Sequence, residues 1–381
     1  MSYVPEVAVW EVTFKCNVNC IHCGSDCETD TRPDELTTSE ALDLVDQLAD
    51  MGCKLVTMSG GEPFLRKDWA IIAHKIRQRC MDLTFVTNGC LITPDKVAIL
   101  QKLKPRSTAI SLDAGEAFLH DYIRGQQGCF NRALQSLDML LNAGLYTSIV
   151  TSLQRINFHQ LEKIKQIVLL YGIDAWQIQV ATPQGRMKKE FAITEAQFYE
   201  AAKFIVATDK RFKRLYVTGA DCFGYFGNLD PFLHPMGWEG CHAGTRCIGI
   251  ESNGNIKGCL SLPGERFVEG NIREKPLKEI WAQKGAFPYN RRFEKDMLTG
   301  YCHQCLFSDI CRGGCTERAY GFASEYCENP LCTHKIEQKG YSNAEQASLN
   351  PDPEGTDLAY HNVKPLPEGF SLKTIPAIIT Y

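Results

Sequence analysis

The sequence lacks the long apolar run, the charge excess and the leader that would assign it to a membrane, a nucleic acid or a secretion pathway. No apolar stretch reaches the roughly 18 residues that a membrane span needs. The net charge of −4 provides neither the basic surface of a nucleic-acid binder nor a polybasic membrane signal. Met1–Trp10 has neither the charged start nor the apolar core of a signal peptide. We therefore expect a cytoplasmic protein with no nucleic-acid or membrane partner.

Cysteine, in contrast, is abundant. The 381-residue chain has 18 of them, and because cytoplasmic thiols are kept reduced, we interpret them as metal ligands and core residues rather than disulfides. Cys16, Cys20 and Cys23 lie on one loop after the apolar run Val7–Thr13. Thiolates are the soft ligands of iron–sulfur clusters, and three of them leave one iron of a cubane open. Zinc is the alternative, although zinc sites usually pair two Cys-x2-Cys units.

Residues 7–185 alternate short β-rich runs with helical patterns, which predicts βα units on a parallel sheet. The predicted strands are Val7–Thr13, Lys54–Ser59, Leu83–Thr87, Thr108–Leu112, Thr147–Ser152 and Trp176–Ala181. The predicted helices are Ser39–Met51, Trp69–Cys80, Pro94–Leu103, Asn131–Asn142 and His159–Tyr171. Six units are too few for an eight-stranded barrel, so we predict an α/β fold with an open, partial (β/α)6 TIM-like barrel. Chemistry in such sheets gathers at the C-terminal ends of the strands.

The composition divides the chain into four parts. Residues 1–190 hold the barrel, and residues 191–238 combine a helix near Glu195–Thr208 with an irregular stretch that we expect to bridge two domains. Residues 239–336 are rich in cysteine and glycine. A segment this short buries little apolar core, so we expect bound clusters to stabilise its fold. Residues 337–381 become polar and proline-rich, which predicts a tail that is extended or disordered alone.

A second motif, the segment Ser59–Pro63 with the sequence SGGEP, ends the second predicted strand. Its adjacent glycines let the backbone approach a ligand, and Glu62 offers a carboxylate acceptor for an ammonium group. Alone, the motif is an ordinary turn. Together with the cysteine triplet it resembles the radical S-adenosylmethionine (SAM) enzymes, and the resemblance covers residues 7 to about 185.

The resemblance implies that the cysteine triplet holds a [4Fe–4S] cluster whose open iron binds SAM, which yields a 5′-deoxyadenosyl radical on one-electron reduction. His22 takes the aromatic position beside the adenine, and Gly60, Gly61 and Glu62 would bind the methionyl amine. The ribose and carboxylate contacts are expected at the ends of later strands, from Thr87, Asn88, Gly89, Ser111, Asp113, Ser152 and Gln154. Each of these residues has a plain alternative as a turn or cap residue.

Four further residues are candidates for the surroundings of this site. Arg124 and Arg186 resemble recurrent elements of one subgroup, with a surface salt bridge as the alternative. Cys27, on the loop of the triplet, and Cys222, in the expected bridge, are the unassigned thiols that we expect nearest the site.

Eight downstream cysteines form a second constellation that resembles the SPASM extension, which holds two auxiliary [4Fe–4S] clusters. By that resemblance the first auxiliary cluster is ligated by Cys241, Cys247, Cys259 and Cys315. The second is ligated by Cys302, Cys305, Cys311 and Cys332. Cys327 lies five residues before Cys332 and is the other candidate for the last ligand. A zinc ribbon made of Cys302, Cys305, Cys311 and Cys315 is the alternative, but it ignores the other four thiols.

SPASM enzymes mostly modify peptides, so the resemblance implies an oxidoreductase that forms a thioether or carbon–carbon crosslink, or oxidises a side chain, in a peptide or small protein. It implies three [4Fe–4S] clusters and SAM as cofactors, and an electron donor such as flavodoxin or ferredoxin. The first predicted strand begins by Val7, without the recognition domain of many such maturases. We therefore expect the barrel mouth, the tail or a separate protein to recognise the peptide.

Two other functions remain as alternatives. A tetrapyrrole side-chain enzyme of the haem-biosynthesis kind shares the two-part layout. An iron–sulfur electron carrier would need no site for a cofactor amine, so the glycine pair with Glu62 disfavours it. The sequence assigns no general base.

Overall fold

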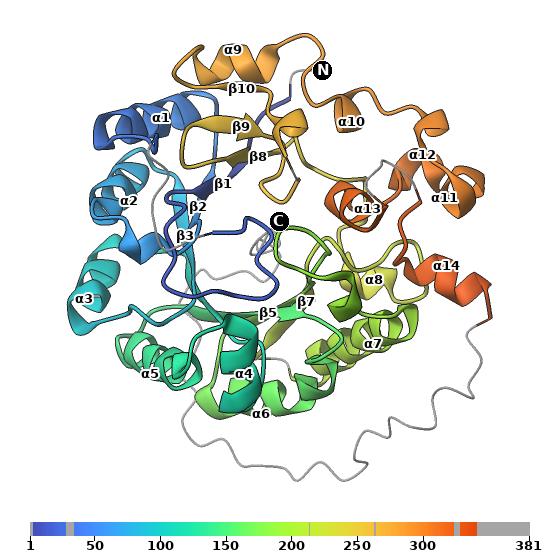
Figure 1. The fold of residues 1–381 in the computed structure, drawn as a ribbon, viewed down its shortest axis with the longest axis horizontal. Coiled ribbons are helices and arrows are strands. Elements are labelled where there is room, and N and C mark those ends of the chain that lie inside the picture. The colour runs from blue at the N-terminus through green and yellow to red at the C-terminus, as the bar shows by residue number, and fades with distance from the viewer. Residues whose placement is uncertain (1–2, 28–33, 213, 263, 324–327, 341–381) are drawn as a thin grey trace.

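A single curved sheet organises the chain. The computed structural model describes residues 3–27, 34–212, 214–262, 264–323 and 328–340. Within these residues ten strands pair in the order β10-β9-β8-β1-β2-β3-β4-β5-β6-β7. Neighbours from β8 to β7 are parallel, and β9 is antiparallel to β8 and β10. Figure 1 shows helices outside the curve of the sheet and the loop after β1 inside it. None of the described helices combines the length and apolar character of a membrane span.

The six predicted βα units are confirmed. The strands are β1 (Val7–Glu11), β2 (Leu55–Ser59), β3 (Asp82–Thr87), β4 (Ser107–Ser111), β5 (Thr147–Leu153) and β6 (Ala175–Val180). The helices are α1 (Thr38–Asp50), α2 (Trp69–Gln78), α3 (Pro94–Leu103), α4 (Ala117–Arg124), α5 (Cys129–Asn142) and α6 (Leu161–Tyr171), with the 3-10 turns η1 (Pro63–Leu65), η2 (Phe158–Gln160) and η3 (Lys189–Phe191). Helix α4 is an addition to the predicted set.

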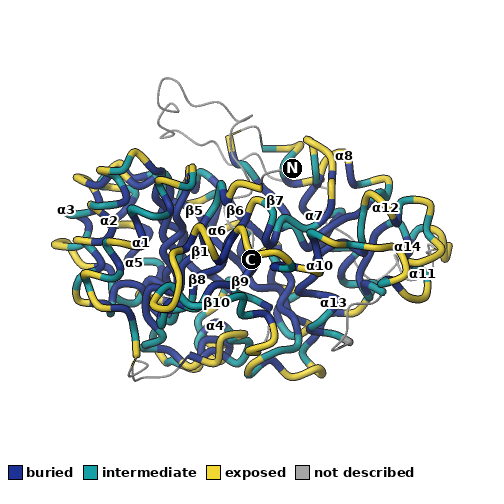
Figure 2. Tube along the Cα trace, turned by 90° about the horizontal axis from the view of Figure 1, so that it is seen from above, coloured by how far each residue is buried: buried dark blue, intermediate teal, exposed yellow. Residues whose placement is uncertain are grey.

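Local sequence explains where these elements begin and which faces they bury. The side chain of Thr37 caps α1, and that of Thr93 accepts from the Lys96 N–H to cap α3, with Pro94 in the first turn as predicted. The Asp121 carboxylate accepts the N–H groups of Gly128 and Phe130, which turns the chain from α4 into α5. The strands are buried on both faces, as Figure 2 shows along the centre of the molecule.

Residues 191–238 differ from the expected bridge. Helix α7 (Glu195–Arg211) confirms the helix predicted near Glu195–Thr208, but it leads into β7 (Tyr216–Gly219), which pairs parallel to β6. A seventh βα unit thus continues the sheet, and the irregular stretch begins only after Gly219, with α8 (Asp230–Leu233) inside it. The sequence hid this unit because β7 is only four residues long.

The cysteine-rich part joins the other edge of the sheet. Its strands are β8 (Cys247–Ile250), β9 (Asn255–Lys257) and β10 (Gly270–Asn271), and β8 pairs parallel to β1. Its helices are α9 (Leu277–Ala282), α10 (Pro288–Arg291), α11 (Gly300–Gln304), α12 (Ser308–Cys311), α13 (Thr316–Ala323) and α14 (Thr333–Gln338), with the turns η4 (Glu265–Phe267) and η5 (Lys295–Met297). The expected tail lies, beyond residue 340, outside the described residues.

Three glycines fix the loop that carries the cysteine triplet, because each lies against a backbone carbonyl of that loop. A Cβ on Gly61 would lie 2.2 Å from the Lys15 oxygen. One on Gly125 would lie 2.2 Å from the oxygen of Asn19, and one on Gly185 would lie 2.3 Å from that of Cys23. Backbone hydrogen bonds accompany all three contacts, including those from Glu62 N–H to Lys15, from Asn19 N–H to Arg124 and from Arg186 N–H to Cys23. Only glycine leaves room for such an approach.

The first prediction concerns Gly125, with Gly128 as its matched control. Both residues have positive φ, +61° and +79°, but a Cβ on Gly128 meets nothing within 4 Å. The substitution Gly128→Ala should cost only about 1–2 kcal/mol for its left-handed backbone. The substitution Gly125→Ala should lower the free energy of unfolding by more, since it also displaces the Asn19 carbonyl. Urea unfolding of both variants measures this difference, and equal losses would contradict the proposed packing.

Candidate functional site

A large cavity lies at the C-terminal ends of the barrel strands and measures about 230 Å³. The triplet Cys16, Cys20 and Cys23 lines one side of it, and residues from the ends of β2 to β6 line the rest. Parallel strands gather their C-terminal ends at one edge, which is where ligands bind in such sheets.

The three thiols suit a bound cluster better than a solvent-exposed role. Burial raises the pKa of Cys16 to about 12 and that of Cys20 to about 11. Hydrogen bonds from Cys27 lower the pKa of Cys23 to about 6. Buried thiolates need a cation for compensation, and the Arg124 guanidinium alone reaches the Cys20 sulfur, at 3.7 Å. In the described chain no three His, Cys, Asp or Glu side chains converge on a single-ion site. Three thiols that line one cavity from one loop are a donor set of the kind that holds an iron–sulfur cluster.

The glycine pair faces the large cavity, whereas Glu62 lies behind it. Gly60 and Gly61 line the cavity together with Thr87 and Asn88. Glu62 is fully buried, and its carboxylate accepts the Thr87 hydroxyl at 2.7 Å and the Asn88 N–H at 2.9 Å. The carboxylate is therefore not positioned for the expected direct contact with the ammonium group of a ligand. Glu62 instead fixes the β3 end that forms the cavity floor.

Asp113 also supports the wall rather than facing the cavity. Its carboxylate is fully buried, pairs with the Arg124 guanidinium at 2.8 Å and accepts the Ser152 N–H at 2.8 Å. The expected contact from Asp113 to a ribose is thus replaced by an ion pair beside the cluster loop. Ser111 and Ser152 do line the cavity. Gln154 is fully buried and lies, like Gly89, outside the lining.

His22 lines the large cavity in its neutral form. Its Nε2 lies 3.7 Å from Asp113 Oδ2. Burial lowers the pKa of His22 to about 4, against the opposing pull of Asp113. A neutral imidazole offers a flat, uncharged surface, which fits the position expected beside an adenine.

Both arginines flagged in the sequence hold the cluster loop. Arg186 donates from Nε to the Cys20 carbonyl at 3.0 Å and from an Nη to the Cys27 carbonyl at 2.9 Å. Arg186 also pairs with Asp26 at 2.8 Å. Arg124 pairs with Asp113, as described above. The alternative of a surface salt bridge is therefore wrong for Arg124, whose ion pair with Asp113 is buried. For Arg186 the ion pair with Asp26 exists, but it is only one of the contacts that this side chain makes with the loop.

The sequence missed the far wall of the large cavity. Gln179 of β6 and Glu317 of α13 line it, with Gln184 from the segment after β6. Nothing in the local sequence distinguishes them, because only the chain's return through the cysteine-rich part brings Glu317 to this wall. Cys27 and Cys222 line the same cavity, which confirms the expectation that they lie near the site.

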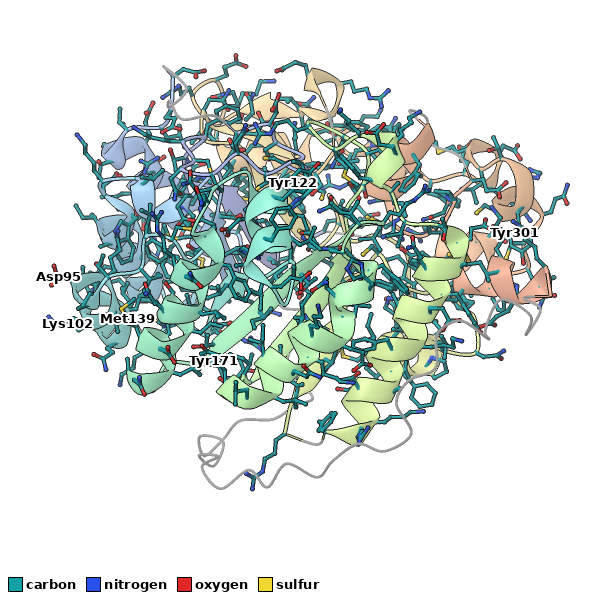
Figure 3. The ribbon with its side chains drawn as sticks, turned by 60° about the horizontal axis from the view of Figure 1, so that its bottom comes forward. Asp95, Lys102, Tyr122, Met139, Tyr171 and Tyr301 are labelled. Carbon is teal, nitrogen blue, oxygen red and sulfur yellow. The ribbon has the colours of Figure 1, made fainter. Side chains whose placement is uncertain are left out.

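The eight downstream cysteines of the proposed clusters separate into two groups. One cavity, the first cysteine cavity, is lined by Cys241, Cys247, Cys259 and Cys315. Another, the second cysteine cavity, is lined by Cys302, Cys305, Cys311 and Cys332. Tyr301 also lines the second cysteine cavity. Figure 3 shows Tyr301 on the side of the molecule opposite Asp95 of α3. Cys315 thus lies apart from the three thiols that a zinc ribbon would join to it. Cys327 lies outside the described residues.

The second prediction concerns the buried Glu62. Burial raises the pKa of its carboxyl from 4.5 to about 7, although three hydrogen bonds oppose the rise. The folded protein therefore binds this proton more tightly than the unfolded chain does. The contribution to stability is complete below pH 4.5 and is lost as the pH rises through about 7. Between pH 5 and pH 8, wild type should lose stability relative to Glu62→Gln in urea unfolding.

The exposed Glu190 provides the control. Glu190→Gln should show the pH profile of wild type, since this side chain is exposed. Parallel profiles for wild type and Glu62→Gln would contradict the raised pKa.

Two family models match this chain. The model of the Radical SAM superfamily matches residues 10–168, and that of SPASM, an iron–sulfur cluster-binding domain, matches residues 241–306. The AdoMet-dependent heme synthase of Methanosarcina barkeri is 29% identical over 354 residues, which cover 89% of this chain and 99% of that protein. The mycofactocin maturase MftC of Mycolicibacterium smegmatis is 30% identical over 318 residues, covering 82% of this chain and 78% of that protein.

Solved structures share the fold. Streptococcus suis SuiB bound to precursor peptide SuiA has a TM-score of 0.71 at 19% identity, covering 86% of this chain and 75% of that chain. Native anSMEcpe with bound AdoMet has a TM-score of 0.68 at 14% identity, covering 90% of this chain and 97% of that chain. The two matched models coincide with the triplet loop and with the start of the cysteine-rich part, on a partial barrel of the expected kind. This chain therefore belongs to the radical SAM superfamily and carries a C-terminal SPASM domain.

Proposed function

We propose that this enzyme cleaves SAM reductively and uses the 5′-deoxyadenosyl radical to oxidise a peptide or small protein. The product carries a thioether or carbon–carbon crosslink, or an oxidised side chain. When bound, a [4Fe–4S] cluster with SAM on its open iron supplies the electron that breaks the carbon–sulfur bond. Cys16, Cys20 and Cys23 would hold it, because their thiols line the large cavity from one loop.

The cavity walls divide the work of binding SAM. Gly60 and Gly61 present bare backbone, which fits the methionyl amine and carboxylate. Thr87 and Asn88, fixed by Glu62, border the same end. Ser111 and Ser152 at the ends of β4 and β5 suit the ribose hydroxyls, and the neutral His22 suits the adenine.

The SPASM cysteines suit electron transfer. Two groups of four thiols, one in each cysteine cavity, would fully coordinate two auxiliary clusters. Oxidation of a peptide releases an electron that such clusters can carry away. An external protein such as flavodoxin or ferredoxin would supply the electron that starts each cycle.

The polar side chains of the far wall support the proposal of a peptide substrate. Gln184 donates to Glu317 at 2.8 Å and Thr182 donates to the same carboxyl at 3.2 Å. The Oε1 atoms of Gln179 and Gln184 are buried without a hydrogen-bond partner. Buried acceptors without donors are costly, and amide N–H groups of a peptide would satisfy them.

The cations of the large cavity are already engaged. Arg124 pairs with Asp113 and Arg186 with Asp26, while His22 is neutral. Among the described lining residues there is no further arginine or histidine, and there is no lysine. A porphyrin would bring several propionate carboxylates to a wall that offers Glu317 and acceptor oxygens, which is unfavourable. The wall therefore favours an amide-rich substrate.

A tetrapyrrole substrate is the second candidate, because relatives carry that activity in their names. Heme synthases of Methanosarcina barkeri and Nitratidesulfovibrio vulgaris match 89% and 87% of this chain at 29% identity. These relatives match over more of this chain than MftC does. A direct test of both substrates is therefore needed.

The third prediction is the iron content of anaerobically reconstituted enzyme. Three cubanes of four irons give about twelve irons per chain. The substitution Cys16→Ala should lower this value to about eight and abolish formation of 5′-deoxyadenosine from SAM, because the remaining clusters bind no SAM. Iron analysis and chromatography of the nucleoside measure both effects. Wild type with only about four irons would reject the auxiliary clusters, and SAM cleavage by Cys16→Ala would reject the role of the triplet.

The fourth prediction identifies the substrate class. The enzyme is co-expressed with the short open reading frames encoded beside its gene, and the peptides are weighed by mass spectrometry. One peptide should lose two hydrogen atoms with wild type and none with Cys16→Ala. In parallel, purified holoenzyme receives SAM, a reductant and iron-coproporphyrin. Loss of carboxyl groups from the porphyrin, with every peptide unchanged, would overturn the proposal in favour of the tetrapyrrole reaction.

A further inference from the structure

Arg318 is a buried cation that forms no ion pair with any described residue. It lies on α13, three residues after Cys315 of the first cysteine cavity and next to Glu317, which lines both cavities, and its side chain is 0% exposed. One Nη donates to the Cys222 carbonyl at 2.5 Å, whereas Nε and the other Nη are buried without a hydrogen-bond partner. The guanidinium faces the ring of Phe198, 5.5 Å from its centroid. No carboxylate of the described residues forms an ion pair with it.

Arg318 keeps its charge when buried, because a guanidinium is not deprotonated in proteins. The nearest carboxyl in sequence, Glu317, already accepts hydrogen bonds from Thr182 and Gln184. A buried charge of this kind is costly unless an anion compensates it.

The four thiols of the first cysteine cavity can supply that anion. Cys259 and Cys315 are buried, so thiolates at these positions in turn need compensation. A [4Fe–4S]2+ core with four thiolates carries roughly two negative charges. A cation and an anion buried side by side compensate each other, and in a medium of low dielectric constant the attraction is strong.

We infer that Arg318 is the counter-ion of the first auxiliary cluster, the one held by Cys241, Cys247, Cys259 and Cys315, and that it raises the reduction potential of this cluster. The inference rests on the proposed function, which places a cluster there. Uptake of one electron, with no proton, makes the site more negative by one charge. A buried cation beside it favours that reduced form. The electron comes from the substrate radical, which loses one proton to solvent as it becomes product.

The position of Arg318 explains why this matters for the reaction. Glu317, its neighbour in sequence, lines both the large cavity and the first cysteine cavity. The first auxiliary cluster is thus separated from the substrate by one side chain. An acceptor at that place needs a potential high enough to take the electron, and Arg318 is the buried cation that tunes it. It acts as a positioning residue, since it reaches neither substrate nor SAM.

The test is an anaerobic redox titration of holoenzyme, followed by electron paramagnetic resonance. The signal of the first auxiliary cluster is recognised by its loss in Cys241→Ala. The substitution Arg318→Gln keeps an amide donor for the Cys222 carbonyl but removes the charge. It should shift the midpoint of this signal to lower potential by at least a tenfold change in the reduction equilibrium, about 59 mV for one electron. The substitution Arg318→Lys, which keeps the charge, should restore most of the wild-type value.

Controls separate this inference from a structural role and from the proposed function. Arg312→Met removes a cation beside Cys311 of the second group and should leave the first midpoint unchanged. Arg318→Met offers a second uncharged variant if Arg318→Gln does not fold. An unshifted midpoint in a folded, uncharged variant with about twelve irons would overturn the role of Arg318 alone. About four irons in wild type would overturn the auxiliary clusters and this inference together.

Discussion

The molecule depends on how closely three backbone carbonyls of the triplet loop approach three glycines. The carbonyls of Lys15, Asn19 and Cys23 each lie where a side chain would otherwise stand. The glycines come from three separate places in the sequence, after β2, after α4 and after β6. The loop is therefore clamped from three sides by backbone, and the side chains of Arg124 and Arg186 add to this support.

Around that loop, buried carboxylates are paired with hydrogen-bond donors or with a cation behind the wall of the large cavity. Glu62 holds the end of β3, and Asp113 holds both Arg124 and the end of β5. These two carboxylates lie behind the wall, and the hydroxyl and backbone groups of Thr87, Asn88 and Ser152 that they fix line the large cavity.

Much of this could be predicted from the sequence, because the signals are local. Apolar periodicity located β1 to β6 and all of their helices except α4, and the family resemblance grouped eleven of the thiols that line the three cavities. The sequence also named Glu62 and Asp113, but it assigned them to a ligand because it cannot reveal which neighbour reaches a carboxylate first. The placement of β7, the pairing of β8 with β1 and the arrival of Glu317 at the far wall depend on residues far apart in the chain. Such contacts produce no periodic pattern in the sequence of either segment that takes part in them.

The pairing of β8 with β1 has a consequence for how the protein is made. Val7 pairs with Leu55 on one side and with Cys247 on the other. During synthesis, β1 leaves the ribosome long before β8 is made, so one edge of β1 stays unpaired until then. Open edges invite pairing with other chains, and contacts of such sequence separation form slowly. Completion of the sheet beside the triplet loop therefore waits for the SPASM domain, since β1 pairs with a strand from each part.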